Sequence, residues 1–374
     1  MTTVVDHLTN LIRIPSVSAH SNRPVIQYAA SVLTSFGWSF REFVYADDSG
    51  TEKVNLIAAP PGQAVADHSV DLAFLCHTDT VPYAQAWPQA LQPELRGEML
   101  HGCGACDVKG FLACLLAAAS SPDLKDLTSL RIVLTADEEV GCIGSKRLIA
   151  ADILRPRRLI VGEPTLLRVA RAGKGYCLAC VTILGREAHS ALPMQGISAI
   201  YPAAHLISAL EQLSAQLATE THRLFDPPFT TLNVGTIHGG TAKNIIPGRA
   251  ELLVEWRPIP GAPPDRVSSF IHNALQQLES KYRGLEASLT ILRQETGFET
   301  AADSSLVRRI ERETNLPATS IPFGSEASAW SAVAEEVVVF GPGDMRFAHS
   351  NRECVPITEL AAAVQSIRSL MDTT

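Results

Sequence analysis

Four short apolar segments of this chain are each followed closely by side chains that can bind a metal ion. Each segment has the length and composition of a strand buried on both faces. The four segments are DLAFLC (71–76), RIVLTA (131–136), RLIVG (158–162) and VVVF (337–340). The side chains that follow them are His77 and Asp79, Glu138 and Glu139, Glu163, and His349. Because ligands of open α/β sheets bind outside the carboxyl ends of the strands, this pattern predicts a metal site at one edge of a largely parallel sheet.

Two of these motifs indicate separate roles for neighbouring side chains. We expect the Asp79 carboxylate to accept a hydrogen bond from a ring nitrogen of His77 and so to fix the tautomer of the ring. Glu138 and Glu139 stand side by side, so one can bind metal while the other holds a metal-bound water and takes its proton. The alternative for this pair is a solvated acidic turn. Mixed histidine and carboxylate ligands suit zinc, or another divalent ion such as cobalt or manganese.

A glycine-rich turn, HGCGACDVKG (101–110), leads into an apolar segment that is predicted to be a buried helix. The turn lacks the GK[ST] ending of a P-loop, and its GxGxxD pattern is not the GxGxxG of dinucleotide-binding folds. Nucleotide binding is therefore disfavoured. Asp107, at the start of the predicted helix, is better placed as a carboxylate ligand of the metal site.

The order of predicted elements indicates two domains, for which 374 residues are sufficient. Helical and strand patterns alternate up to about residue 170, which predicts an α/β domain with a mostly parallel sheet. In residues 171–292 the predicted order is instead strand, helix, strand, strand, helix, strand, which is the order of a ferredoxin-like α+β domain. The α/β pattern then returns. We therefore expect a discontinuous domain of residues 1–170 and 293–374 with the second domain inserted.

Charge and hydropathy exclude several classes of partner. The net charge of −8 and the lack of a basic run argue against nucleic-acid binding. The longest apolar stretch, near residues 110–119, is too short to span a membrane. The first ten residues have neither the basic nor the apolar region of a secretory signal. The sequence thus predicts a cytoplasmic protein without nucleic-acid or membrane partners.

The eight cysteines are expected to be reduced thiols, as is usual in a long intracellular chain. Two pairs have CxxC spacing: Cys103 with Cys106, and Cys177 with Cys180. The second pair lies in a predicted strand, which does not suit the short knuckles of a zinc ribbon. Buried small apolar side chains are therefore favoured over a structural four-cysteine zinc site.

Eight motifs, taken in order, resemble those of the M20 metallopeptidase–deacylase family, which contains deacetylases, desuccinylases, aminoacylases and carboxypeptidases. They are FLCHTDTVP (74–82), HGCGACDVKG (101–110), TADEEVG (135–141), VGEPT (161–165), GREAHSALPMQGISAI (185–200), KNIIPG (243–248), FGSEAS (323–328) and AHSNRE (348–353). The set spans nearly the whole chain. The resemblance implies a zinc-dependent exopeptidase-like catalytic domain with an inserted dimerisation (lid) domain.

The resemblance also implies roles for the ligand residues. His77 and Glu163 would hold one zinc ion, and Glu139 and His349 the other. Asp107 would bridge the two ions and would be followed by a cis peptide bond. Cobalt or manganese could substitute for zinc.

Further roles follow from the same resemblance. Asp79 would orient His77, and Glu138 would be the general base. His189, on the inserted domain, would stabilise the oxyanion in the partner subunit of a homodimer. Arg257 would bind the substrate carboxylate with the help of Asn244.

The expected substrate is a small N-acyl amino acid. The FGSEAS segment is more similar to acetylornithine deacetylases than to desuccinylases, which implies N2-acetylornithine as substrate and a place in arginine biosynthesis. Glu326, in this segment, would face the ornithine ammonium group, and a structural carboxylate is the alternative. A succinyl-diaminopimelate desuccinylase, an M20 dipeptidase or carboxypeptidase, and a non-catalytic homologue that binds metal or amino acids remain open.

Overall fold

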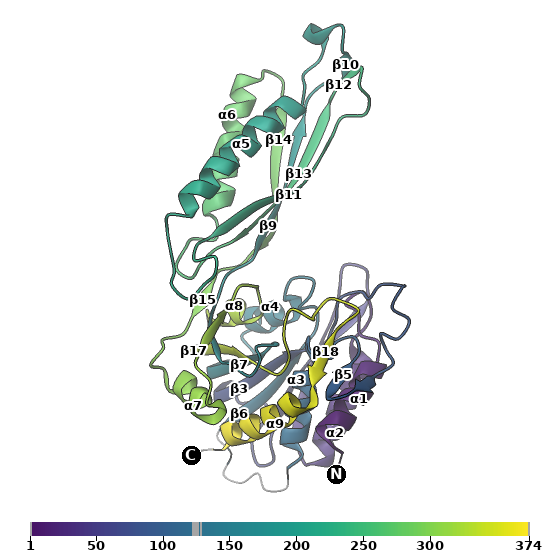
Figure 1. Cartoon of the computed structure of the whole chain (residues 1–374), viewed down its shortest axis with the longest axis vertical. Helices are drawn as coiled ribbons and strands as arrows, with labels where there is room; N and C mark the ends of the chain where they lie inside the picture. Colours follow the sequence, from purple (N-terminus) through teal and green to yellow (C-terminus); the bar gives the residue numbers. More distant parts are fainter. Residues whose placement is uncertain (1, 122–126, 128, 373–374) are drawn as a thin grey trace. The chain divides into compact units, whose positions relative to one another are not determined.

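The computed structural model of the chain describes residues 2–121, 127 and 129–372. The chain divides into two compact units (Figure 1). Unit 1 consists of Met1–Ala172, Glu299–Ser320 and Ser325–Thr374, and unit 2 consists of Gly173–Phe298 and Ile321–Gly324. Unit 2 is thus an insertion in the chain of unit 1.

The main sheet of unit 1 is mixed, and its centre is parallel. Its strands, in spatial order, are β1 (Ser39–Ala46), β2 (Glu52–Ala59), β6 (Leu130–Thr135), β3 (Ser69–His77), β7 (Arg155–Gly162), β17 (Glu336–Phe340), β8 (Ala170–Gly173) and β15 (Phe298–Glu299), with β16 (Thr319–Ile321) paired to β8. The strands β6, β3, β7 and β17 run parallel to one another. Their carboxyl ends therefore meet at one edge, and the α/β class predicted from the sequence is confirmed.

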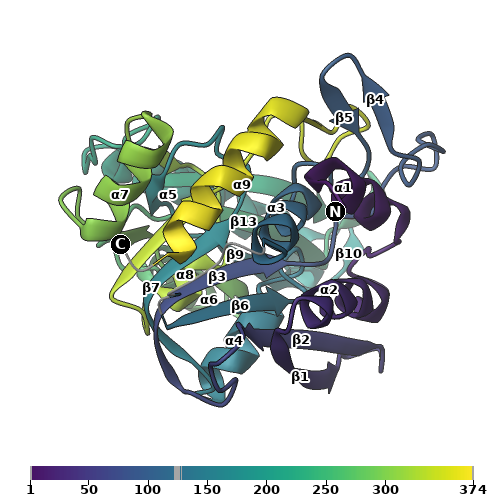
Figure 2. The same cartoon turned by 90° about the horizontal axis from the view of Figure 1, so that it is seen from below.

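Helices and loops cover this sheet. The helices of unit 1 are α1 (Val4–Arg13), α2 (Arg23–Ser35), α3 (Lys109–Ala119), α4 (Ile143–Ala150), α7 (Ser305–Thr314), α8 (Ala327–Trp330) and α9 (Ile357–Met371). Residues of α1, α2, α3, α7 and α9 share one hydrophobic core with the sheet. Helix α3 lies against α9 (Figure 2). Nearly every residue of α3 is buried, as its small apolar composition predicts.

A small sheet joins the segment before the glycine-rich turn to the C-terminal part of the chain. It consists of β4 (Glu94–Arg96), β5 (Met99–His101) and β18 (Cys354–Pro356), in the order β18-β5-β4. Cys354 pairs with His101 in its antiparallel register. This pairing brings the C-terminal part of the chain next to the start of the turn that carries Asp107.

Unit 2 is an antiparallel sheet with two helices on one face. Its elements are β9 (Cys177–Leu184), β10 (Ala188–His189), the 3-10 helix η1 (Pro193–Gln195), α5 (Ile200–Leu217), β11 (Thr231–Gly239), β12 (Ile245–Ile246), β13 (Arg249–Arg257), α6 (Arg266–Lys281) and β14 (Glu286–Gln294). The sheet order is β11-β13-β9-β14. Figure 1 shows α5 and α6 along the same side of this sheet. Together with the strand–helix–strand–strand–helix–strand order, this is the ferredoxin-like arrangement.

The alternation of β9 explains its two cysteines. Every second residue of β9 is buried against the helices, and Cys177 belongs to this face. Cys180 is three positions later, so it lies on the opposite and more exposed face. The two thiols therefore cannot point into one zinc site. Among the residues described, every cysteine is a free thiol, and all but Cys180 are buried. No helix in the described part of the chain has both the length and the hydropathy needed to cross a bilayer.

Candidate metal centre

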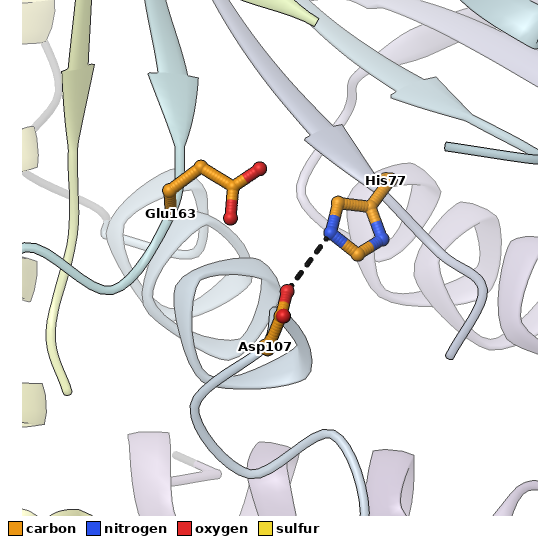
Figure 3. A group of neighbouring side chains, drawn as sticks. All are labelled: His77, Asp107 and Glu163. Atoms are coloured by element: carbon orange, nitrogen blue, oxygen red, sulfur yellow. Dashed lines mark hydrogen bonds and ion pairs between the residues drawn. The ribbon is translucent and has the colours of Figure 1, made fainter. Parts of the chain in front are cut away.

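The carboxyl edge of the sheet brings three ligand side chains together. His77 ends β3, Glu163 directly follows β7, and Asp107 stands two residues before α3. One ligand atom from each lies within 4.8 Å of the others. Figure 3 shows the three side chains turned toward one another, with a contact of 3.2 Å between His77 Nε2 and Asp107 Oδ1. All three residues are buried.

A second group shares Asp107 with the first. It consists of Asp107, Glu139 and His349, whose ligand atoms also lie within 4.8 Å of one another. His349 Nε2 is 3.1 Å from Asp107 Oδ2 and 3.2 Å from Glu139 Oε1. The two oxygens of Asp107 thus face different histidines. The peptide bond between Asp107 and Val108 is cis.

The electrostatics of the cluster show an excess of buried negative charge. Burial raises the pKa of Glu163 and of Glu138, and neighbouring carboxylates raise both further. Burial alone would lower the pKa of His77, but its hydrogen bond to Asp107 and the surrounding carboxylates raise it. Hydrogen bonds to Asp107 and Glu139 raise the pKa of His349 to about 10. Histidines that gain protons so readily mark a place where a metal cation would be strongly favoured.

The donor set of both groups therefore fits divalent metal ions. Each group combines one imidazole with two carboxylates, and one carboxylate is common to both. Imidazole and carboxylate suit zinc, and also cobalt or manganese. A pair of cations would balance the charge of the buried carboxylates, which is otherwise costly to keep out of water.

Glu138 lies beside the two groups but belongs to neither. Its side chain is buried, and Cys142 Sγ donates a weak hydrogen bond of 3.5 Å to its Oε1. The backbone bond from Cys142 N to Glu138 O, 2.9 Å long, closes the same turn. The Glu138 carboxylate thus lies near the two ligand groups and is a member of neither.

Asp79 differs from its expected geometry. His77 Nδ1 donates to the backbone oxygen of Asp79 at 3.1 Å, whereas the carboxylate oxygen Oδ1 is 3.7 Å away. The carboxylate is instead occupied by the backbone N–H groups of Glu138 (3.1 Å) and Glu139 (3.3 Å) and by the hydroxyl of Ser18 (2.6 Å). Because a carbonyl oxygen can only accept, the hydrogen of a neutral His77 ring lies on Nδ1, and the lone pair of Nε2, which points toward Asp107, is available to a metal.

The strand β2 beside this edge carries supporting polar residues that the sequence motifs did not indicate. Lys53 and Asn55 lie in the apolar strand β2 and are both buried. Asn55 accepts a hydrogen bond from Ala136 N and donates to Gly144 O, at 3.0 Å each. Lys53 pairs with Asp137. Two polar residues two positions apart on a buried strand were the available signal, since such groups require partners.

The remaining predicted residues of the inserted domain lie at two ends of unit 2. His189 is exposed on β10, which pairs with β12 (Figure 1). Ser190 N donates to the backbone oxygen of Asn244 at 2.9 Å, so His189 and Asn244 are neighbours. Arg257 ends β13, a strand that begins only after Asn244, at Arg249. The nine-residue strand β13 therefore lies between Arg257 and the other two, and its eight steps span about 26 Å at about 3.3 Å per residue.

Arg257 is held by its own unit. Its Nε donates to Glu255 Oε1 at 2.8 Å, and its guanidinium lies 4.8 Å from the ring centroid of Tyr176. The side chain is half-buried. It is thus a fixed planar cation, suited to a carboxylate ligand.

Glu326 lies in unit 1 and is completely buried at the start of α8. Its Oε1 accepts a hydrogen bond of 2.7 Å from the hydroxyl of Ser145, which in turn accepts one of 2.7 Å from Trp330 Nε1. Burial raises the pKa of Glu326 to about 7. A substrate ammonium group could reach this carboxylate only if the side chains around it moved.

Comparison with known proteins finds relatives over nearly the whole chain. Residues 73–373 match the peptidase family M20/M25/M40. An acetylornithine deacetylase of Myxococcus xanthus is 45% identical over 356 residues, which cover 94% of this chain and 92% of the relative.

Solved structures show the same fold at lower identity. A tripeptidase from Staphylococcus aureus superposes with a TM-score of 0.77 at 21% identity, covering 98% of this chain and 96% of the other. A dinuclear metal-binding peptidase of the M20 family from Bacillus subtilis gives a TM-score of 0.71 at 14% identity, covering 98% and 96%.

Proposed function

The chain belongs to the peptidase family M20/M25/M40, a family of hydrolases, and we propose that it is a two-zinc amidohydrolase that removes the acyl group from the nitrogen of a small amino acid. One observation carries the proposal. Asp107 is common to two ligand groups, and Glu138 stands beside them without belonging to either.

The residues divide into two metal sites. His77 and Glu163 would hold one ion, Glu139 and His349 the other, and Asp107 both. The native metal is proposed to be zinc, with cobalt or manganese as substitutes. When bound, such a metal pair polarises an acyl carbonyl and lowers the pKa of a water molecule.

Glu138 is the proposed general base. It takes the proton of the attacking water and passes it to the leaving amine. Its buried position beside the ligand groups supports this role, because burial raises its pKa and so makes the carboxylate a better proton acceptor. Asp79 acts indirectly, by holding the backbone of Glu138 and orienting His77.

The inserted domain would supply three further contacts. Arg257 would bind the substrate carboxylate, while His189, supported by Asn244, would donate to the developing oxyanion. Within one unit 2 the long strand β13 keeps Arg257 far from His189 and Asn244. A small substrate cannot span that distance. If all three residues serve one active site, His189 and Asn244 must come from a second copy of the chain.

A homodimer through unit 2 is therefore part of the proposal. The surface next to β10 and β12 supports it, because large apolar side chains are exposed there, including Leu192, Met194 and Tyr201. A cavity of about 680 Å³ borders this surface and is lined by residues of three segments, 190–201, 245–247 and 281–283, Tyr201 among them. A cytoplasmic location remains a prediction of the sequence.

The proposed substrate is N2-acetylornithine, which would yield ornithine and acetate, a step of arginine biosynthesis. The support is the deacetylase named above, which is 45% identical over nearly the whole chain. Arg257 would take the α-carboxylate. Glu326 is the candidate partner of the side-chain ammonium group. Because Glu326 is completely buried, the side chains around it would have to move for the ammonium group to reach it.

Assays over a panel of substrates test the proposal. Purified enzyme with two equivalents of zinc per chain is given N2-acetylornithine, N-acetylmethionine, N-succinyl-diaminopimelate and a dipeptide. We expect the highest kcat/KM with N2-acetylornithine. A preference for the succinyl compound or the dipeptide would overturn the substrate. A protein that binds two metal ions and hydrolyses none of the panel would be a binding protein instead.

A further inference from the structure

One buried carboxylate accepts hydrogen bonds from several backbone N–H groups of the loop that carries Asp107. Glu353 is 3% exposed. Its Oε2 accepts from Gly104 N at 2.9 Å, and its Oε1 accepts from Cys106 N and from Asp107 N, each at 3.1 Å. The backbone oxygen of Glu353 accepts a fourth bond, of 3.2 Å, from Gly102 N. The loop from Gly102 to Asp107 is thus held at four points by a single residue.

Two other backbone N–H groups of the loop have acceptors elsewhere: Cys103 N donates to Ala90 O at 2.8 Å and Ala105 N to Gly102 O at 3.1 Å. Gly104 has a φ of +76°, in the left-handed region that glycine reaches without strain. The backbone N–H groups of Gly104, Cys106 and Asp107 donate to the Glu353 carboxylate rather than joining a strand or a helix. Without an acceptor, these three N–H groups would be buried donors with no partner, which is unfavourable. Bonds from backbone N–H to an ionised carboxylate are stronger than neutral ones, so Glu353 suits three donors at once.

Glu353 also links two ligand segments that are far apart in the sequence. It follows His349 by four residues and directly precedes β18, which pairs with β5 at the start of the Asp107 loop. His349 itself contacts Asp107 at 3.1 Å. The C-terminal segment therefore reaches Asp107 twice, once through the His349 side chain and once through the Glu353 carboxylate.

We propose that Glu353 is a positioning residue that sets the backbone of the Gly102–Asp107 loop so that Asp107 presents one oxygen to each ligand group, and that metal affinity depends on it. This inference rests on the proposed role of Asp107 as the shared ligand. It adds a residue that touches neither metal nor substrate and acts through the backbone of Asp107.

Glu353→Gln tests the proposal. Glutamine has the same shape but only one acceptor oxygen, so its amide would face at least one backbone N–H with a donor. We expect zinc affinity, measured by equilibrium competition with a chelator, to fall about 10- to 100-fold, as is usual when a residue that supports a ligand is changed. Circular dichroism checks that the variant is folded.

Glu336→Gln is the matched control. Glu336 is also a carboxylate that accepts from a backbone N–H, that of Leu306 at 3.2 Å, but it lies at the amino end of β17, away from the ligand edge. Its substitution should leave zinc affinity unchanged. A folded Glu353→Gln protein with the zinc affinity of the wild type would overturn the proposal. A wild-type protein that binds no zinc would instead overturn the proposed function.

Hydrogen exchange of the wild-type apoprotein tests the proposal without relying on a variant, which could misfold. The amides of Gly104, Cys106 and Asp107 should be protected if the carboxylate holds them. A peptide covering residues 102–108 should therefore exchange far more slowly than the exposed turn near Gly50. Equal exchange rates in the two segments would show that Glu353 does not hold the loop.

Discussion

Lys53 Nζ lies 2.8 Å from Asp137 Oδ1, and the two side chains are only 1% and 2% exposed. The second oxygen of Asp137 accepts a hydrogen bond of 2.8 Å from Tyr45. Asp137 has a φ of 60° and directly precedes Glu138 and Glu139. This buried pair therefore fixes the turn that carries the proposed base and one proposed metal ligand. A charged pair in this position is weak evidence for stability by itself, but breaking it is costly.

Lys53→Met should destabilise the protein, because it leaves the charge of Asp137 buried without its cation. We expect the free energy of unfolding, measured in urea, to fall by about 3–5 kcal/mol. Lys146→Met is the control, because Lys146 is exposed on α4, and it should change stability by no more than about 0.5 kcal/mol. Adding Asp137→Asn to Lys53→Met should recover part of the loss. Additive effects of the two changes would mean that the pair is not coupled.

Two substitutions separate metal binding from proton transfer. Asp107→Ala should remove both metals, because one carboxylate serves both ligand groups. Glu138→Gln should retain both metals and lower kcat by several orders of magnitude, since only the proton acceptor is lost. Metal analysis of the two purified variants, alongside the wild type, checks this. A Glu138→Gln protein without metal would show that Glu138 is a ligand.

The parts of the fold that sequence patterns could predict are those with a regular period. Apolar runs gave the parallel strands, and residues at their ends gave the ligand side chains, because the chain leaves every such strand at the same edge. The partners of Asp79 could not be predicted in this way. Its carboxylate bonds to the backbone of Glu138 and Glu139, and such contacts depend on how the loop bends rather than on residue type. Glu353 was missed for the same reason, because it acts on backbone N–H groups of a distant loop.

Action of His189 in a partner subunit can be tested by complementation. His189→Ala and Glu138→Gln chains, each inactive alone, are mixed and allowed to exchange subunits. Heterodimers then contain one site with both an intact base and an intact His189, so activity should return to at most half of the wild-type value. The separation of His189 from Arg257 along β13 is the physical reason. Confirmed heterodimers without any activity would show that His189 acts within its own chain, whereas a His189→Ala chain that is active alone would show that His189 is not needed.

Glu326→Gln tests substrate choice. If the Glu326 carboxylate faces the ornithine ammonium group, its loss should weaken hydrolysis of N2-acetylornithine far more than that of N-acetylmethionine, which carries no side-chain charge. Loss of a charged partner in a desolvated pocket costs roughly 2–4 kcal/mol, or about 30- to 1,000-fold in kcat/KM. The measurement is the ratio of the two kcat/KM values in the variant and in the wild type.

Ser145→Ala is the matched control for this prediction. It removes the hydroxyl that donates to Glu326 Oε1 and accepts from Trp330, so it disturbs the same buried network without removing the charge. Both substrates should then be affected alike. If Glu326→Gln also lowers both kcat/KM values equally, Glu326 is a structural carboxylate at the start of α8. Its complete burial is consistent with that role. The discrimination of ornithine would in that case come from another residue, while the metal ligands and Glu138 would keep their proposed roles.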